Sequence, residues 1–192
     1  MSNKDTRKKL IRVARDLFHH KGYSETSIRD IGSRAGISSS IIYHYFKNKE
    51  DILLEVISNA EQELIDQLKL IGENVQDPLE CLKEMLLEHI VSFGHKKESK
   101  IIVVDYFGLR GKRAKMSKKK QREIYSIYMK KLKELKEAGL LKDIDLKVIA
   151  FSIFGIINWF YRWHKEKGQL SKEDVAKAIM SMLFHGILKE KK

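Results

Sequence analysis

Apolar residues recur along this chain at the three- and four-residue spacing of amphipathic helices. In the first such segment the apolar stripe is formed by Leu10, Val13, Ala14, Leu17 and Phe18, and lysine and arginine occupy the other faces. Gly22 follows in the position of a helix C-cap. The periodicity predicts an all-α chain of about nine helices: 4–21, two short helices within 26–46, 49–72, 78–96, 99–108, 117–138, 145–165 and a last helix that opens at Ser171.

The stretch from Thr26 to Leu53 predicts two short helices around a tight corner. Thr26 stands where an N-cap hydroxyl is needed, and Ile28 and Ile31 fall on one face of the first helix. Gly36 follows a small residue and precedes an apolar one, which suits a corner that needs a positive φ. This is the layout of a helix-turn-helix.

The second helix of the pair divides into an inner and an outer face. Ser38 is placed to cap it, and Ile42 and Phe46 face the core. A reading helix needs polar and aromatic side chains that are free to reach base edges. The residues left on the outer face are Ser39, Ser40, Tyr43 and His44.

This segment resembles the DNA-binding domain of the TetR family of transcriptional regulators. The family pattern is matched in order and without gaps at Thr26, Ile31, Ala35, Gly36, Ser38, Tyr43, Phe46, Lys49 and Leu53. Gly32, Ser40 and Tyr45 replace the usual alanine, glycine and histidine. The first replacement lowers helix propensity slightly, and the other two alter the surface that faces DNA.

The resemblance implies two domains and a set of DNA contacts. Residues 1–48 would form a three-helix DNA-binding domain, and residues 49–192 a helical effector-binding and dimerisation domain linked to it by the helix 49–72. We expect a palindromic double-stranded operator as the partner, with Ser39, Ser40, Tyr43 and His44 near base edges. Phosphate contacts are expected from Thr26, Ser38, Tyr45 and Lys49.

Composition agrees with a DNA-binding protein. The chain has 38 Lys and Arg against 26 Asp and Glu, a net charge of +12, which suits a nucleic acid or an anionic ligand. Cys81 is the only cysteine, so no internal disulfide forms and a reducing cytoplasm is expected. The N-terminus lacks the apolar run of a signal peptide, and the apolar run 148–161 is too short to cross a bilayer.

The sequence gives no support for catalysis, so we expect a protein that is not an enzyme. The basic stretch 112–136 is expected to be solvated, and the glycines at 108 and 111 lack the spacing of a phosphate-binding loop. The seven histidines show no metal-ligand spacing, so neither a metal nor a cofactor is expected.

The last two helices predict a homodimer. Large apolar side chains, including Phe151, Phe154 and Trp159, lie on more than one side of the helix 145–165, and the final helix is nearly as apolar. A second subunit is the simplest cover for both. Such a dimer would place its two reading helices about 34–36 Å apart, in successive major grooves.

The C-terminal half is similar to the FadR branch of the same family, through Asn158, Trp159, Trp163 and Gly168. This resemblance implies a repressor of fatty-acid or sterol-side-chain degradation that is released by an acyl-CoA thioester. Such an effector needs an apolar tunnel and cations for its phosphates. The residues expected to bind it are Phe93, Tyr106, Phe107, Arg110, Arg113, Phe154, Asn158, Trp159 and Arg162.

Two other readings stay open on the sequence alone. The effector of such a repressor is alternatively a drug-like hydrophobic compound. A protein of another class, a basic protein that coats DNA without sequence preference, would also carry this charge, and its affinity would fall with salt equally for every DNA.

Overall fold

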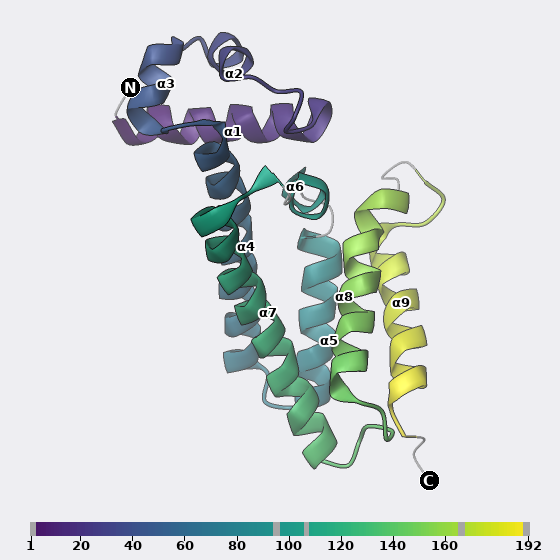
Figure 1. Ribbon diagram of the computed structural model, residues 1–192. Helices are drawn as coiled ribbons and strands as arrows, with labels where there is room; N and C mark the ends of the chain where they lie inside the picture. Colours follow the sequence, from purple (N-terminus) through teal and green to yellow (C-terminus); the bar gives the residue numbers. More distant parts are fainter. Residues whose placement is uncertain (1–2, 94–96, 106–107, 165–167, 190–192) are drawn as a thin grey trace. The chain divides into compact units, whose positions relative to one another are not determined.

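The computed structural model describes residues 3–93, 97–105, 108–164 and 168–189, without the side chains of residues 92, 93, 161 and 162. Across these residues the chain is all-α, as the periodicity predicts (Figure 1). The helices are α1 (Asn3–Lys21), α2 (Ile28–Ala35), α3 (Ser39–Tyr45), α4 (Lys49–Asn74), α5 (Pro78–Glu88), α6 (Lys97–Asp105), α7 (Gly111–Glu137), α8 (Leu146–Trp163) and α9 (Lys172–Ile187), with a π-helical turn, η1, at His89–Phe93.

The chain packs as two compact units. Unit 1 is made of residues 1–62 and 97–120, and unit 2 of residues 63–96 and 121–192. The long helices α4 and α7 each contribute residues to both units. This division is one of packing; the functional boundary after residue 48 stays a prediction.

Unit 1 is built around the inner faces of α1, α2, α3 and the first half of α4. Leu10, Phe18, Ile31 and Ile42 are fully buried in its core, where Ile101 of α6 joins them. Full burial of each such side chain contributes roughly 1.5–3 kcal/mol. In Figure 1, α2 and α3 lie over α1, so the core holds the short helices in place.

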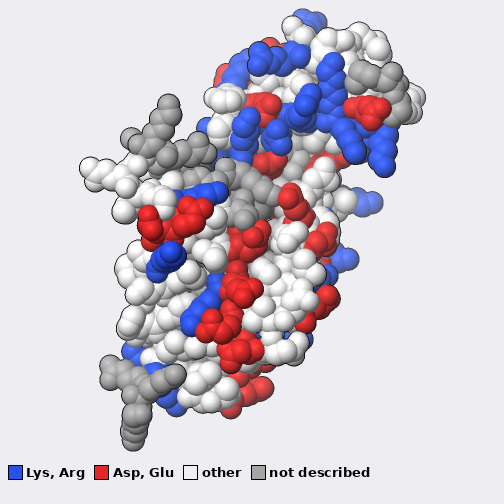
Figure 2. All heavy atoms as spheres, turned by 180° about the vertical axis from the view of Figure 1, so that it is seen from behind, with Lys and Arg blue, Asp and Glu red and all other residues white. Residues whose placement is uncertain are grey.

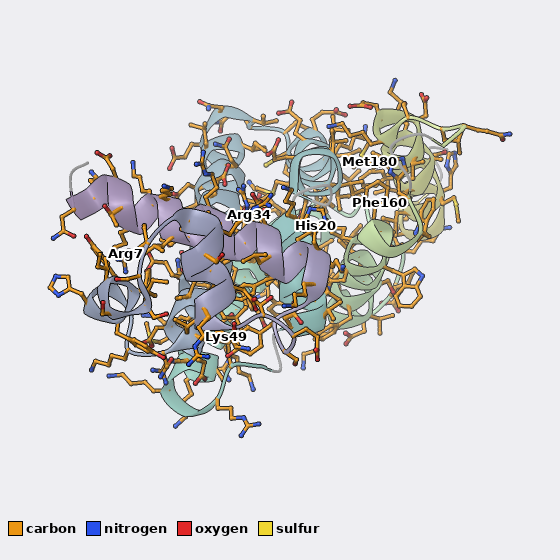
Figure 3. The ribbon with its side chains drawn as sticks, turned by 90° about the horizontal axis from the view of Figure 1, so that it is seen from above. Arg7, His20, Arg34, Lys49, Phe160 and Met180 are labelled. Atoms are coloured by element: carbon orange, nitrogen blue, oxygen red, sulfur yellow. The ribbon has the colours of Figure 1, made fainter. Side chains whose placement is uncertain are left out.

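Unit 2 is a set of helices packed along their lengths. α5 contacts α9, and η1 contacts α5, α8 and α9. Its buried side chains include Leu82, Tyr128, Ile153, Phe160 and Val175. Figures 1 and 3 show α8 and α9 next to each other.

The two units differ in charge. Unit 1 carries 20 Lys and Arg against 10 Asp and Glu, whereas unit 2 carries 18 against 16. Figure 2 shows the lysine and arginine side chains gathered on unit 1 and a succession of acidic side chains on unit 2. The net positive charge of the protein therefore belongs almost entirely to the unit that contains the helix-turn-helix.

Two predicted helix boundaries differ from the structure by more than one helical turn. The helix predicted to start at residue 117 starts at Gly111, because Arg113 in its basic first turn pairs with Glu50 and Asp51 of α4. Cations at a helix N-terminus oppose the helix dipole, and these carboxylates offset that cost. The helix predicted over 78–96 ends as an α-helix at Glu88 and continues as η1; residues 94–96 lie outside the described chain.

Candidate DNA-binding and effector sites

The first helix of the helix-turn-helix is capped by Ser27. Ser27 Oγ accepts a hydrogen bond from the Asp30 N–H, and the Asp30 carboxylate accepts one from the Ser27 N–H, so the two form a capping box. Bonds from the backbone and side chain of Ser27, with Lys21, lower the pKa of Asp30 to about 2. Ser27 and Asp30 have the spacing of this motif in the sequence, which is the signal that the prediction overlooked.

The prediction that Thr26 caps this helix was therefore wrong. Thr26 is buried, and its hydroxyl donates to the Gly22 carbonyl at 2.7 Å, which closes the turn after α1. Gly22 has the positive φ of 87° expected of a helix C-cap. The hydroxyl of Thr26 is thus used inside the protein, and its expected phosphate contact remains untested.

The corner between α2 and α3 depends on two glycines. Gly36 adopts a left-handed conformation with φ of 65° and donates its N–H to the carbonyls of Gly32 and Ser33. A Cβ on Gly32 would lie 2.6 Å from the Ile37 carbonyl oxygen, so the glycine allows a closer approach than alanine would. The departure from the family pattern at this position has a structural reason, which helix propensity alone does not reveal.

The reading helix α3 has the two faces that the sequence predicts. Ser38 caps it by accepting the Ile41 N–H, and Ile42 and Phe46 are buried. On the outside, Tyr43 is 55% exposed. Ser40 and His44 are exposed, while Ser39 and Tyr45 are half-buried.

Side chains of α1 and α4 hold the end of α3 in place. The Arg7 guanidinium lies over the ring of Phe46, 5.1 Å from its centroid, and forms an ion pair with Glu55. Figure 3 looks onto this part of unit 1, with Arg7 of α1, Arg34 of α2 and Lys49 of α4 labelled. Arg7 belongs to the support of the reading helix, a role that the sequence analysis missed because nothing in the sequence pairs Arg7 with Glu55.

The ammonium group of Lys49, predicted to contact a DNA phosphate, is bound to backbone carbonyls of unit 1. Its Nζ donates to the carbonyls of Tyr23, Ser24 and Thr26, at 2.7, 3.3 and 2.7 Å, and lies 4.3 Å from the centre of the Tyr23 ring. Burial lowers its pKa, against the opposing charges of carboxylates such as Glu25. Lys49 thus ties the start of α4 to the turn between α1 and α2, and its expected phosphate contact remains untested.

The first turn of α4 also holds the start of α7. Asn48 caps α4 by accepting the Asp51 N–H, but the Asp51 carboxylate accepts the Lys47 N–H, whereas in a full capping box it would accept the Asn48 N–H. Asp51 also accepts from Arg113 at 2.6 Å, and this bond lowers the pKa of Asp51. Arg113, which was expected to bind effector phosphates, is therefore paired with carboxylates inside unit 1.

Among the predicted effector residues, Phe154 has the best-defined surroundings. It lies in unit 2 among the rings of Tyr125, Tyr128 and His89, with centroid distances of 5.3–6.3 Å. His89 Nδ1 and the Tyr128 hydroxyl are 3.1 Å apart, and that hydroxyl donates to the Met85 carbonyl. Burial lowers the pKa of His89 to about 3 and raises the pKa of Tyr128, so both are neutral at pH 7.

Three other members of the predicted effector set are exposed to solvent. Asn158 and Trp159 are exposed on α8, and Arg110 is exposed in unit 1. Tyr106, Phe107 and the side chains of Phe93 and Arg162 lie outside the described residues.

An apolar stripe is exposed along α8. Val148, Phe151, Trp159 and Trp163 are between 48% and 65% exposed, at a spacing that puts them on one face of the helix. Met182 of α9 is 77% exposed. On an ordinary protein surface exposed apolar residues are scattered singly. Several of them on one helix face therefore indicate a surface that contacts another molecule.

Two further searches of the described residues gave negative findings. No group of three or more His, Cys, Asp or Glu side chains is arranged to hold a metal ion. None of the described helices is long and apolar enough to cross a membrane.

A short helix that is anchored by its inner face and carries exposed aromatic and hydroxyl groups on its outer face is the reading element of a helix-turn-helix DNA-binding protein. Comparison with known families gives the particular class. Residues 10–56 match the model for bacterial regulatory proteins of the tetR family, and residues 75–187 match the tetracyclin repressor-like C-terminal domain. The chain belongs to the TetR family of transcriptional regulators, which are not enzymes and need no cofactor.

Individual relatives extend along nearly the whole chain. The HTH-type transcriptional repressor KstR2 of Mycolicibacterium smegmatis is 25% identical over 184 residues, 94% of this chain and 90% of the relative. The structure of the ketosteroid regulator KstR2 of Mycobacterium tuberculosis has a TM-score of 0.87 at 23% identity, over 99% of this chain and 98% of its own. AibR in complex with isovaleryl coenzyme A and operator DNA has a TM-score of 0.86 at 25% identity, over 93% and 98%.

Proposed function

We propose that this protein is a homodimeric repressor that binds a palindromic operator and is released from it by a hydrophobic acyl-CoA thioester. The observation that carries the DNA-binding part is the capped helix α3, with Tyr43 and His44 exposed on a buried support. In this role the protein would act on the chromosome in the cytoplasm and control fatty-acid degradation.

The operator contacts follow from the exposure of α3. Ser40, Tyr43 and His44 are the exposed members of the predicted set and are assigned to base edges, with Ser39 beside them. Ser38, at the helix N-terminus, and Tyr45 are assigned to phosphates. Phosphate contacts from Thr26 and Lys49 have weaker support, because the polar atoms of both side chains already form hydrogen bonds within unit 1.

The dimer is assigned to α8 and α9. A second copy of the chain would cover the exposed stripe of Phe151, Trp159 and Trp163, and α9 contributes the exposed apolar side chain of Met182. Trp159, predicted at first to touch the effector, belongs to this face in the proposal. A dimer also supplies the second reading helix that a palindromic operator requires.

The effector is assigned to unit 2, near Phe154. The aromatic rings of Tyr125 and Tyr128 around it suit an apolar chain, and His89 with Tyr128 offers a polar point beside them. Support for a thioester comes from AibR, whose solved complex contains isovaleryl coenzyme A and operator DNA. The likeness to KstR2, a ketosteroid regulator, supports a larger hydrophobic ligand as the second candidate effector.

Calorimetric titration with acyl-CoA thioesters of increasing chain length tests the effector class. We expect saturable binding that strengthens with chain length, weak binding of free CoA, and release of operator DNA by the thioesters that bind. Phe154→Ala should weaken binding, while Tyr43→Ala should leave it unchanged. No binding across the series would overturn the thioester and redirect the search to drug-like hydrophobic compounds.

DNA selection from a random pool tests the operator separately from the effector. An enriched palindrome that loses binding when one half-site is scrambled supports a sequence-specific dimer. Equal affinity for every DNA, with the same dependence on salt, would instead identify a non-specific DNA-coating protein.

A further inference from the structure

Unit 1 contains a cavity that neither the operator site nor the effector site uses. It has a volume of about 490 Å³ and opens where the turn after α1, the first turn of α4, the end of α6 and the start of α7 meet. This volume lies in the range of small-molecule pockets. Its walls include Tyr23, Glu50, Val104, Asp105, Gly108 and Arg110.

One wall of the cavity carries a carboxylate without a cationic partner. Asp105 is half-buried, and among the described residues none forms an ion pair with it, in contrast to Asp16 and Asp51 of the same unit. Burial raises the pKa of Asp105, more than the Tyr23 N–H and two nearby lysines lower it. A hydrogen-bond donor or a cation from a ligand would improve the surroundings of this carboxylate.

Another wall carries the guanidinium of Arg110, which likewise has no ion pair among the described residues. The Arg110 backbone N–H donates to Glu50 at 2.6 Å, but no ion pair of its side chain occurs within the described part of the chain. Glu50 itself is occupied, because its other carboxylate oxygen accepts from Arg113. The cavity therefore presents one carboxylate, Asp105, and one guanidinium, Arg110, that form no ion pair among the described residues.

The remaining walls are formed by the apolar Val104, the aromatic ring of Tyr23, Gly108 and the polar Ser24. Val104 is 48% exposed, and the Tyr23 ring packs so closely on Gly108 that a Cβ there would lie 2.8 Å from it. A purely anionic ligand would face the carboxylates of Glu50 and Asp105, and a purely cationic one would add charge beside Arg110 and Arg113. A ligand with one charge of each sign avoids both costs.

We propose that this cavity binds a small zwitterion of the α-amino-acid type. The ammonium group of the ligand pairs with Asp105, its carboxylate pairs with Arg110, and its hydrocarbon part lies against Val104 and Tyr23. The site is independent of the acyl-CoA proposal, because all of its described residues belong to unit 1. Its ligand would bind directly to the turn and the helix start that support the reading helix.

Three probes of matched shape test this proposal on the full-length protein. L-norleucine carries both charges, hexanoate lacks the ammonium group, and pentylamine lacks the carboxylate. We expect saturable binding of L-norleucine alone in calorimetric titration and in thermal-shift measurements. Absence of norleucine binding, or equal binding of all three probes, would overturn the proposal.

Substitutions then place the binding in this cavity. Asp105→Asn and Arg110→Met should each weaken norleucine binding by more than about tenfold, since each leaves one ligand charge unpaired. Glu84→Gln and Lys118→Met make the same charge changes at exposed positions elsewhere and should leave binding unchanged. Far-ultraviolet circular dichroism verifies that each variant is folded. Equal affinity in the cavity variants and the controls would contradict the assignment.

Discussion

Polar groups are arranged differently in the two units. In the helix-turn-helix of unit 1 the capping hydrogen bonds are local: the hydroxyls of Ser27 and Ser38 each accept from the N–H three residues further along the chain. In unit 2 the deepest polar pair, His89 and Tyr128, joins helical segments that are 39 residues apart in the sequence. The helix-turn-helix is therefore specified largely by local signals, whereas the buried polar pair of unit 2 depends on contacts that only the folded chain creates.

The surfaces of the two units differ in their charge and polarity. Unit 1 exposes the polar and aromatic side chains of α3 and most of the net positive charge, whereas unit 2 exposes an apolar stripe on α8. A charged surface selects a polyanion, and an apolar one selects a protein. This contrast can be tested by substitutions that affect one unit and spare the other.

The largest effect is expected from Phe151→Glu. A carboxylate in the middle of the α8 stripe would be desolvated in a dimer, which we expect to weaken dimerisation by about a hundredfold or more, or roughly 3 kcal/mol. Analytical ultracentrifugation should show monomers, and operator affinity should fall with the dimer. Leu70→Glu changes a similarly exposed apolar residue on α4 and should leave the dimer intact. A Phe151→Glu protein that stays dimeric would refute the assignment of the interface to α8.

Tyr43→Ala should affect unit 1 alone. Its side chain is 55% exposed, so stability and dimerisation should hold, while operator binding should weaken by about 1–3 kcal/mol for each half-site. Fluorescence anisotropy with labelled operator measures the loss. The Tyr43→Phe variant separates the hydroxyl from the ring. Unchanged operator affinity in Tyr43→Ala would remove Tyr43 from the reading surface.

Lys49→Met should lower the stability of unit 1 by about 1–3 kcal/mol. The substitution leaves the carbonyls of Tyr23, Ser24 and Thr26 without the ammonium that now bonds them. Urea denaturation followed by circular dichroism gives the difference, and Lys47→Met at an exposed neighbouring position is the control. If stability is unchanged but the salt dependence of DNA binding becomes shallower, Lys49 is a phosphate contact after all.

A smaller, pH-dependent effect is expected from His89. Its pKa is about 3 in the folded protein and near 6.5 when unfolded, so below pH 6.5 the unfolded state takes up a proton that the folded state does not. Stability should fall by about 1 kcal/mol between pH 7.5 and pH 5.5, and this slope should become shallower in His89→Gln.

His19→Gln is the comparison that assigns the pH slope to one unit. Burial also lowers the pKa of His19, which belongs to unit 1, so this variant too should lose part of the slope, but a smaller part. A slope that is the same in His89→Gln as in the parent would mean that His89 does not control the pH response.

The sequence allowed most of the helix-turn-helix to be predicted, because its signals are local. The spacing of Ile31, Gly36, Ile42 and Phe46 gave both short helices, their corner and their inner faces, all of which the structure confirms. The ammonium–carbonyl bonds of Lys49 were not predictable, since they depend on a turn more than 20 residues away in the chain.

In unit 2, helix number and order were predicted, but the chemistry of its interior was not. A single histidine in an apolar segment does not reveal that it is buried against Tyr128, nor that the helix changes to a π-helical turn beside it. Arg113 shows the opposite error: its place in a basic run suggested an anionic ligand, whereas Asp51 provides the anion within the protein. The chain brings these residues together only when it folds.

The only thiol of this protein, Cys81, is fully buried on α5, and burial raises its pKa. A cysteine introduced at the exposed position Lys47 would therefore react with a maleimide or methanethiosulfonate reagent well before Cys81 does. Each protomer would then carry one spin label beside the reading helix, with no need to remove the native thiol. Pulsed electron paramagnetic resonance in solution would measure the distance between the two labels of the proposed dimer. That distance would report the spacing of the two reading helices directly.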